Sequence, residues 1–258
     1  MADSIITDDF IDLGTITSRT EVAAYPDDNI EEYWHLKRRF RANDLTKTNW
    51  LLKFDFGAAK TVEGVFLNDV NFDKVQIQGD NEVNFGAPIQ YDSGIIDIGL
   101  DERVNRYKVF IPITGFNLQW MRIYIPAAAT AVGSYQTKWE VGSVVVLATS
   151  PTISKNAMLR TSAKPFQDIS LPSGGFERIS LGDNIRWEGE ITIEQRAEVD
   201  EAEYWAINLL DSAEPLIFYE NADDTSKVYL CLRDTDYAGT RLYNGLVRGN
   251  TIKLKELV

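Results

Sequence analysis

The sequence predicts a mainly β protein built from two β-sandwich domains, the second of which is flanked by one α-helix. Short apolar stretches recur between turn residues, and several of them alternate with period two, as half-buried strands do. Aromatic residues make up 11% of the chain, which favours strands over helices. Strand patterns at this spacing, with a single helical segment, are typical of a sandwich rather than of a helix-covered sheet.

The first domain is expected to span residues 1–148, where strand patterns follow one another directly. Residues 51–57 predict a strand ended by Gly57, residues 75–79 alternate, and residues 141–147 are apolar throughout, as in a buried strand. Further strands are expected at 62–67, 107–113 and 121–125. Hydrophobicity falls and turn formers gather at residues 148–152, so a domain boundary is predicted after residue 148.

The second domain is expected to span residues 149–258. Residues 160–178 are irregular and predict an extended loop or a hairpin arm, whereas residues 186–194 alternate as a strand. A helix is predicted at about 199–211, because apolar residues recur there at helical spacing and Pro215 follows. Later strands are expected at 216–219, 228–232, 242–247 and 251–257.

The charge of the chain bears on its partners and its compartment. A net charge of −13 argues against nucleic-acid binding, which draws its affinity from clustered lysine and arginine. The single cysteine, Cys231, lies in an apolar run and is expected to be a buried small hydrophobe. The N-terminus does not have the pattern of a signal peptide, and no apolar run approaches about 20 residues. Synthesis in the cytoplasm without membrane insertion is therefore expected.

Catalytic and metal-binding patterns are sparse. The single histidine, His35, excludes a histidine metal cluster, and the nucleophile-elbow and phosphate-loop motifs do not occur. Two acidic stretches, 27–29 and 223–224, lack the oxygen spacing of a helix-loop-helix calcium site and are interpreted as turns. We expect no enzyme, no cofactor and no metal. A carboxylate pair acting on polysaccharide stays open, because acidic residues number 39.

Aromatic rings in loop-like segments suggest carbohydrate binding as an alternative, since flat rings stack on sugars and nearby amides or carboxylates accept hydroxyl donors. The candidate residues are Tyr25, Asp28, Asn29 and Trp34. Trp139 also lies in such a segment, but a tryptophan in a β-sandwich is more often part of the core.

The first domain resembles discoidin-like (galactose-binding-like) jelly-roll domains over residues 15–148. Tyr25-Pro26-Asp27-Asp28-Asn29-Ile30 followed by Trp34 resembles the opening of that family, and Trp50 to Gly57 resembles its "Trp-x-x-x-Asp-Leu-Gly" strand. Met121 to Ile125 resembles its late "Tyr-x-Arg-Ile" strand. The resemblance implies a jelly-roll sandwich. Ile30-Glu31-Glu32-Tyr33 stands where sugar-binding members carry a calcium-supporting Gly-Asp turn.

The second domain resembles domains of bacteriophage distal tail and baseplate proteins, through the strand around Trp187, the helix around Trp205 and the strand that follows Pro215. This resemblance implies a structural tail-tip component located in the virion. It implies a ring homo-oligomer formed through the second domain, with other tail proteins as partners, and an outward-facing first domain that touches host-surface glycan. The arm residues Pro165, Phe166, Pro172 and Phe176 are the expected ring contacts. A glycan-adhesion module and a polysaccharide-active enzyme are the alternatives.

Overall fold

The computed structural model describes residues 4–7, 10–31, 39–101, 106–133, 136–148, 152–153, 155–163, 166–170, 176–180, 186–193, 215–219, 228–233, 239–241, 247–249 and 251–257. It divides into two compact units. One comprises Asp9–Pro151 with Asp223–Val228 and is here called the sandwich unit. The other comprises Met1–Asp8, Thr152–Ala222 and Tyr229–Val258 and is here called the second unit. No helix within the described ranges has the length and apolar character needed to cross a membrane.

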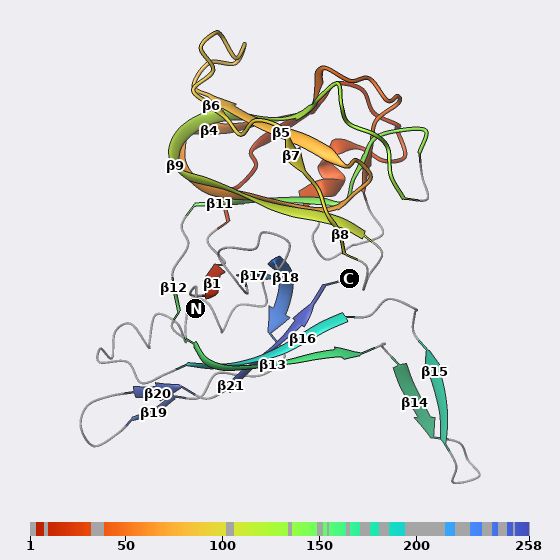
Figure 1. Ribbon diagram of the computed structural model, residues 1–258, viewed down its shortest axis with the longest axis vertical. Coiled ribbons are helices and arrows are strands. Elements are labelled where there is room, and N and C mark those ends of the chain that lie inside the picture. The colour runs from red at the N-terminus through yellow and green to blue at the C-terminus, as the bar shows by residue number, and fades with distance from the viewer. Residues whose placement is uncertain are drawn as a thin grey trace. The chain divides into compact units, whose positions relative to one another are not determined.

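The sandwich unit is built on an eight-stranded antiparallel sheet in the order β11-β4-β9-β5-β6, with β2 paired to β4, β7 to β5 and β8 to β9 (Figure 1). Its strands are β2 (Thr15–Ser18), β4 (Asn49–Val70), β5 (Lys74–Asp80), β6 (Tyr91–Asp92), β7 (Ile96–Asp97), β8 (Leu100–Asp101), β9 (Arg106–Ile125) and β11 (Ser143–Leu147). A short 3-10 helix, η1 (Asp27–Glu31), and the pair β3 (Phe40–Arg41) and β10 (Glu140–Val141) complete the unit.

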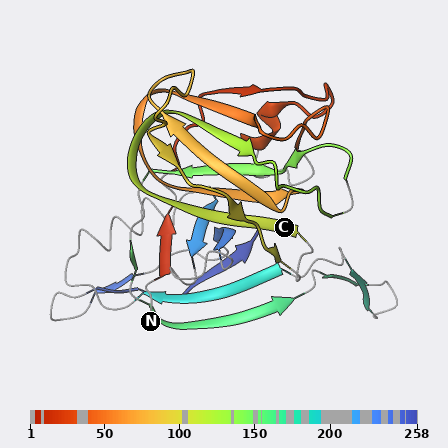
Figure 2. The same cartoon turned by 45° about the horizontal axis from the view of Figure 1, so that its top comes forward.

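The two layers of the sandwich are made largely by the same two strands. β4 pairs with β9 along nearly its whole length, but the register shifts between Asp55 and Lys60. The backbone bends there at Gly57, with φ of 72°, and on β9 at Thr114 and Gly115, with φ of 60° and 73°. Both strands therefore turn from one layer into the other, and Figure 2 shows them curving around one side of the unit.

Every second side chain along the strands points inward, and these side chains fill the space between the two layers. The core is made largely of aliphatic and aromatic side chains from β4, β5, β9 and β11. Its large members include Phe54 on β4, Phe40 on β3, and Phe72 and Trp139 in the segments between strands. The Trp139 ring packs edge-on against Phe72 with centroids 6.1 Å apart, and its Nε1–H donates to the carbonyl of Thr46 at 3.0 Å. The core interpretation of Trp139 is therefore confirmed.

Several expected strands are longer than the sequence indicated. Residues 51–57 and 62–67 belong to the one strand β4, and residues 107–113 and 121–125 belong to β9. The prediction that Gly57 ends a strand was wrong, because its left-handed backbone bends the strand, which continues to Val70. Pairing with β9 skips residues 56–59 and resumes at Lys60. The strand expected at 141–147 is divided at Gly142 into β10 and β11.

The second unit contains a seven-stranded sheet in the order β12-β1-β17-β18-β21-β16-β13. Its strands are β1 (Ser4–Thr7), β12 (Thr152–Ile153), β13 (Lys155–Ala163), β16 (Arg186–Ile193), β17 (Leu216–Tyr219), β18 (Val228–Arg233) and β21 (Thr251–Glu256). β1 pairs with β12 and β17, so the first residues of the chain join this sheet, although the sequence placed residues 1–148 together. Cys231 is buried in β18, as expected. The helix expected at 199–211 lies outside the described residues.

Two short hairpins accompany this sheet. β14 (Phe166–Ser170) and β15 (Phe176–Ser180) pair antiparallel over five residues each, with Phe166 opposite Ser180 and Phe176 opposite Ser170. A hairpin thus occupies residues 166–170 and 176–180, whereas residues 160–163 of the expected arm belong to β13. β19 (Gly239–Arg241) and β20 (Val247–Gly249) form the other hairpin. Of the expected ring contacts, Pro165 and Pro172 lie outside the described residues.

Candidate functional site

The sequence-predicted sugar residues lie on and beside η1 in the sandwich unit. The guanidinium of Arg41 stacks over the ring of Tyr25 at 4.0 Å from the centroid. The Asn29 side-chain amide donates to the carbonyl of Arg39 at 3.1 Å, so it holds the chain that returns from η1. Asp28 is exposed, and Trp34 lies outside the described residues. The structure thus brings Tyr25, Asp28 and Asn29 to one segment, where two of the three side chains contact the protein itself.

The arginine that covers Tyr25 is held by a buried carboxylate. Glu140 is 2% exposed and accepts from Arg41 Nε at 2.6 Å and from Arg39 Nη1 at 3.2 Å. Its backbone N–H donates to the side-chain oxygen of Asn71 at 2.7 Å. Charge-assisted bonds of this kind fix side chains firmly. The Tyr25 ring is therefore packed as part of a structural network.

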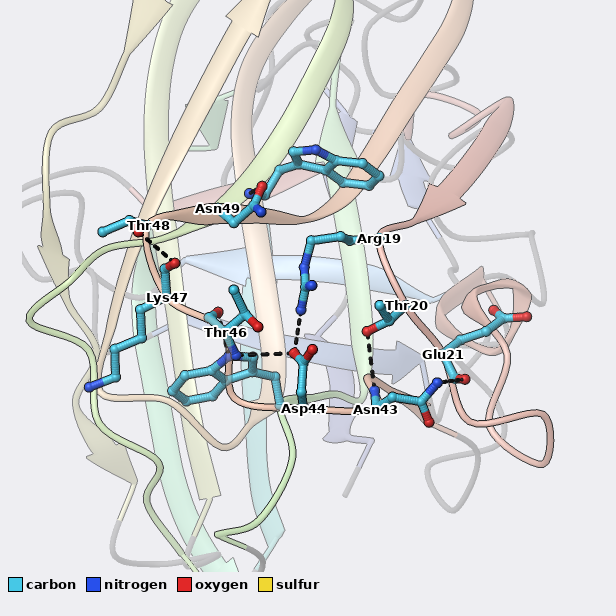
Figure 3. Close-up of polar contacts among 11 residues, drawn as sticks. Arg19, Thr20, Glu21, Asn43, Asp44, Thr46, Lys47, Thr48 and Asn49 are labelled. Carbon is cyan, nitrogen blue, oxygen red and sulfur yellow. Dashed lines mark hydrogen bonds and ion pairs between the residues drawn. The ribbon is translucent and has the colours of Figure 1, made fainter.

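A second polar cluster joins the segment after β2 to the loop before β4 (Figure 3). Arg19 forms an ion pair with Asp44, and Asn43 donates from its backbone N–H to the Thr20 hydroxyl at 3.3 Å and from its side chain to the carbonyl of Glu21. Burial raises the pKa of Asp44, but the hydrogen bonds from Arg19 and Thr46 outweigh it, so the pKa lies below its ordinary value. These side chains tie the two segments to each other.

A different arrangement covers the outer side of the layer formed by β4, β9 and β5, here called the open sheet face. The register pairs its members in three rows across the strands, and the residues between them along each strand point into the core. The rows are Trp50, Tyr124 and Gln76; Lys53, Arg122 and Gln78; and Asp55, Trp120 and Asp80.

Aromatic rings flank the middle row of this face on both sides. Trp50, Tyr124 and Trp120 are each partly exposed. Directly paired residues on one face of an antiparallel sheet have Cβ atoms about 4.5–5.5 Å apart, and rows lie about 7 Å apart along the strand. The Tyr124 and Trp120 rows are therefore about 13 Å apart, with Lys53 and Arg122 between them, and this span is longer than a single sugar ring.

An amide chain links the middle row to a carboxylate on β6. Arg122 Nε donates to Gln78 Oε1 at 2.7 Å, and Gln78 Nε2 donates to Asp92 Oδ2 at 2.9 Å. Gln76 Nε2 donates to both Asp92 oxygens, at 2.6 and 2.8 Å. Burial raises the pKa of Asp92, but the bonds from Gln76 and Gln78 outweigh it and lower that pKa. Asp92 therefore stays charged while contacting amides rather than a cation.

Lys53 and Arg122 occupy directly paired positions on β4 and β9. The Phe85 ring lies 4.2 Å from the Arg122 guanidinium and 5.9 Å from Lys53 Nζ, which is also 5.1 Å from the Trp50 ring. Burial lowers the pKa of both cations, and for Lys53 the charge of Arg122 adds to the effect. In the described part of the chain, no ion pair within 4 Å joins either of them to a carboxylate.

The loop that carries Phe85, residues 81–90, is anchored to β9. The Asn81 side chain donates to the carbonyl of Asn117 at 3.1 Å and accepts from the backbone N–H of Gln119 at 2.8 Å. Phe85 itself is only 6% exposed and has φ of 50°. The loop therefore holds the Phe85 ring in a fixed place beside the two cations.

The open sheet face combines stacking surfaces with hydrogen-bond donors and acceptors, which is the chemistry of a sugar-binding surface. The sequence pattern did not predict this face. Alternation over 121–125 does place Arg122 and Tyr124 on one side, but only the strand register sets Lys53 and Trp50 beside them. Among the side chains that the structure describes, no group of three histidine, cysteine or acidic residues is placed to hold a metal ion.

Comparison with known proteins finds several solved structures that are distantly similar to this chain. No protein-family model and no curated protein matches the chain. It is similar to the CBM32 of AlyQ in complex with 4,5-unsaturated mannuronic acid, with 19% identity, coverage of 54% of this chain and 98% of that one, and a TM-score of 0.39. It is also similar to chitosan-binding module 1 of a chitosanase/glucanase from Paenibacillus sp. IK-5, with 14% identity, coverage of 53% and 96%, and a TM-score of 0.40.

A further similar structure is CBM32-3 from a family 31 glycoside hydrolase of Clostridium perfringens, with 10% identity, coverage of 55% of this chain and 96% of that one, and a TM-score of 0.41. These similar structures are carbohydrate-binding modules. At such identities and TM-scores the likeness supports no inference about a ligand, and the β-sandwich described above stands on its own strand pairing.

Proposed function

We propose that the sandwich unit is a non-catalytic carbohydrate-binding module that holds glycan on its open sheet face. The observation that carries this proposal is the set of three partly exposed rings, Trp50, Tyr124 and Trp120, around polar side chains on one rigid sheet. Rings of this size supply apolar area for the C–H face of a sugar. Gln78 and Asp80 are only 6% and 7% exposed, so the partly exposed Gln76, Lys53 and Arg122 are the side chains that meet its hydroxyl groups.

The open sheet face is favoured over the η1 segment because side chains of the η1 segment already contact other parts of the protein. Tyr25 is covered by Arg41, and the Asn29 amide is bonded to the backbone. Side chains on β-strands are also held more rigidly than side chains on loops, so less conformational entropy is lost when a ligand binds. Binding through Tyr25, Asp28 and Asn29 stays a prediction that the same experiment tests.

The experiment is a glycan array with the full chain, followed by calorimetric titration of the best glycans. We expect Trp120→Ala to weaken binding at least about 10-fold, which corresponds to about 1.4 kcal/mol. Tyr25→Ala and Asp28→Ala are the matched controls and are expected to retain wild-type affinity. Loss of binding in the controls but not in Trp120→Ala would move the site to η1. An array without any signal would remove the proposal.

The tail-tip role and the polysaccharide-active enzyme stay predictions. The tail-tip role is compatible with glycan binding by the sandwich unit, and it is tested separately by whether the chain assembles.

A further inference from the structure

The open sheet face carries a like-charge pair at its centre. Lys53 and Arg122 stand directly opposite each other on β4 and β9, an arrangement that destabilises an antiparallel pair. The Phe85 and Trp50 rings offset part of this cost through their negative faces. Nearby rings do not supply a full counter-charge. Among the described residues no carboxylate lies within 4 Å of either cation, and the charges of Asp92 and Asp80 act on Arg122 from farther away.

The carboxylates that face this pair have other partners. Asp92 accepts from Gln76, Gln78 and the backbone N–H of Gly94. Asp80 accepts from the backbone N–H groups of Asn81 and Glu82. Asp55 accepts from the backbone N–H of Gly57 at 2.9 Å and from Gln119 at 3.4 Å. Each acid on the face is thus bonded to neutral groups.

Donors remain on both cations. Arg122 has five N–H groups and Lys53 three. Among described partners, the Nε–H of Arg122 donates to Gln78, and Lys53 Nζ donates to the carbonyl of Val83 at 3.4 Å. The planar guanidinium and the ammonium can therefore meet one anionic group from two sides.

The net charge of −13 does not prevent an anionic group from binding to Lys53 and Arg122 at short range. At about 0.1 M salt the Debye length is about 10 Å, so distant surface acids are largely screened while a contact ion pair is not. We infer that Lys53 and Arg122 make the open sheet face selective for sugars that carry a negative substituent, the carboxylate of a uronic acid or a sulfate ester. This inference rests on the proposed glycan-binding function of the same face.

Matched ligands test the inference on the unaltered full chain by calorimetric titration. The first pair is a panel of oligouronides and their methyl esters, and the second is sulfated oligosaccharides and their desulfated forms. We expect at least one charged form to bind 10-fold or more tightly than its neutral counterpart, and the pair that shows the difference identifies the anion. Equal binding of charged and neutral forms overturns the inference and leaves the glycan-binding proposal intact. Absence of binding by every ligand of this panel overturns the inference, whereas the glycan-binding proposal is removed only by a glycan array without any signal.

Variants then assign the selectivity to residues. Lys53→Met should abolish the preference for the charged form, keep binding of the neutral form within about two-fold, and leave thermal stability unchanged or raised, because it removes a like charge. Lys60→Met, at an exposed lysine elsewhere on β4, is the control for total charge. Arg122→Gln is the second variant, and its melting temperature checks that the Phe85 loop still packs. Charge preference that survives in both Lys53→Met and a folded Arg122→Gln would overturn the assignment.

Discussion

At the scale of single residues, the sandwich unit depends on a buried carboxylate between two arginines. Glu140 is 2% exposed and bonded to Arg39 and Arg41. Arg39 also forms an ion pair with Asp69 at 2.9 Å, so removing Glu140 takes this carboxylate chiefly from Arg41, at a cost of at most about 3 kcal/mol. We expect Glu140→Ala to lower the melting temperature strongly and Glu140→Gln to lower it less, since the amide keeps an acceptor. Asp28→Ala, at an exposed carboxylate, serves as the control. An unchanged melting temperature for Glu140→Ala would contradict this account.

Asp73, in the loop before β5, makes the stability of the folded chain depend on pH. Its two oxygens accept from the backbone N–H and the hydroxyl of Thr130, both at 2.6 Å. Burial raises the pKa of Asp73, but these bonds outweigh it, so the pKa lies below the ordinary 3.8. The charged form is then favoured in the folded state. Its contribution to stability is present above the ordinary pKa and is lost as the pH falls through the lower folded value.

Thermal unfolding across pH measures this effect. The melting temperature of the wild type should stay nearly level from about pH 7 to 5 and fall below about pH 4. Asp73→Asn should melt lower at neutral pH, and its decline on acidification should be shallower, because one depressed carboxyl has been removed. Parallel curves for the two proteins would show that the Asp73–Thr130 contact does not contribute.

At the scale of elements, the bend that carries β4 from one layer to the other depends on Gly57. Its φ of 72° is left-handed, and a Cβ built there would meet no atom within 4 Å. Gly57→Ala therefore tests backbone conformation alone and should cost about 1 kcal/mol. Gly99→Ala is the matched control, since Gly99 also has open space and does not have a positive φ. Equal unfolding free energies for the two variants would contradict the conformational explanation.

The strands themselves were predictable where the sequence alternates. Residues 75–79 and 186–194 match β5 and β16 closely, because alternation reports a strand with one buried side. The joining of two expected strands into β4, and of two into β9, was not predictable. A bend at Gly57 or at Thr114 and Gly115 gives the same local signal as a turn that ends a strand.

At the scale of the whole molecule, the expected ring stays a prediction that mass photometry of the full chain can test. A ring should appear as a multiple of the 29.2 kDa chain mass. If the arm makes the contacts, Phe166→Ser combined with Phe176→Ser should dissociate it, because both positions lie on the hairpin β14–β15. A wild-type chain that stays at its monomer mass would argue against ring assembly by the chain alone.

The sequence by itself determined the β class, the positions of β4, β5, β9, β11, β16, β17, β18 and β21, and the buried places of Trp139 and Cys231. These follow from local periodicity and from side-chain hydrophobicity. Only the tertiary structure decided that β1 joins the second unit and that Trp50, Lys53 and Arg122 share one face. Such proximity depends on the register between strands about 70 residues apart in the chain, and a one-residue slip would point those side chains into the core.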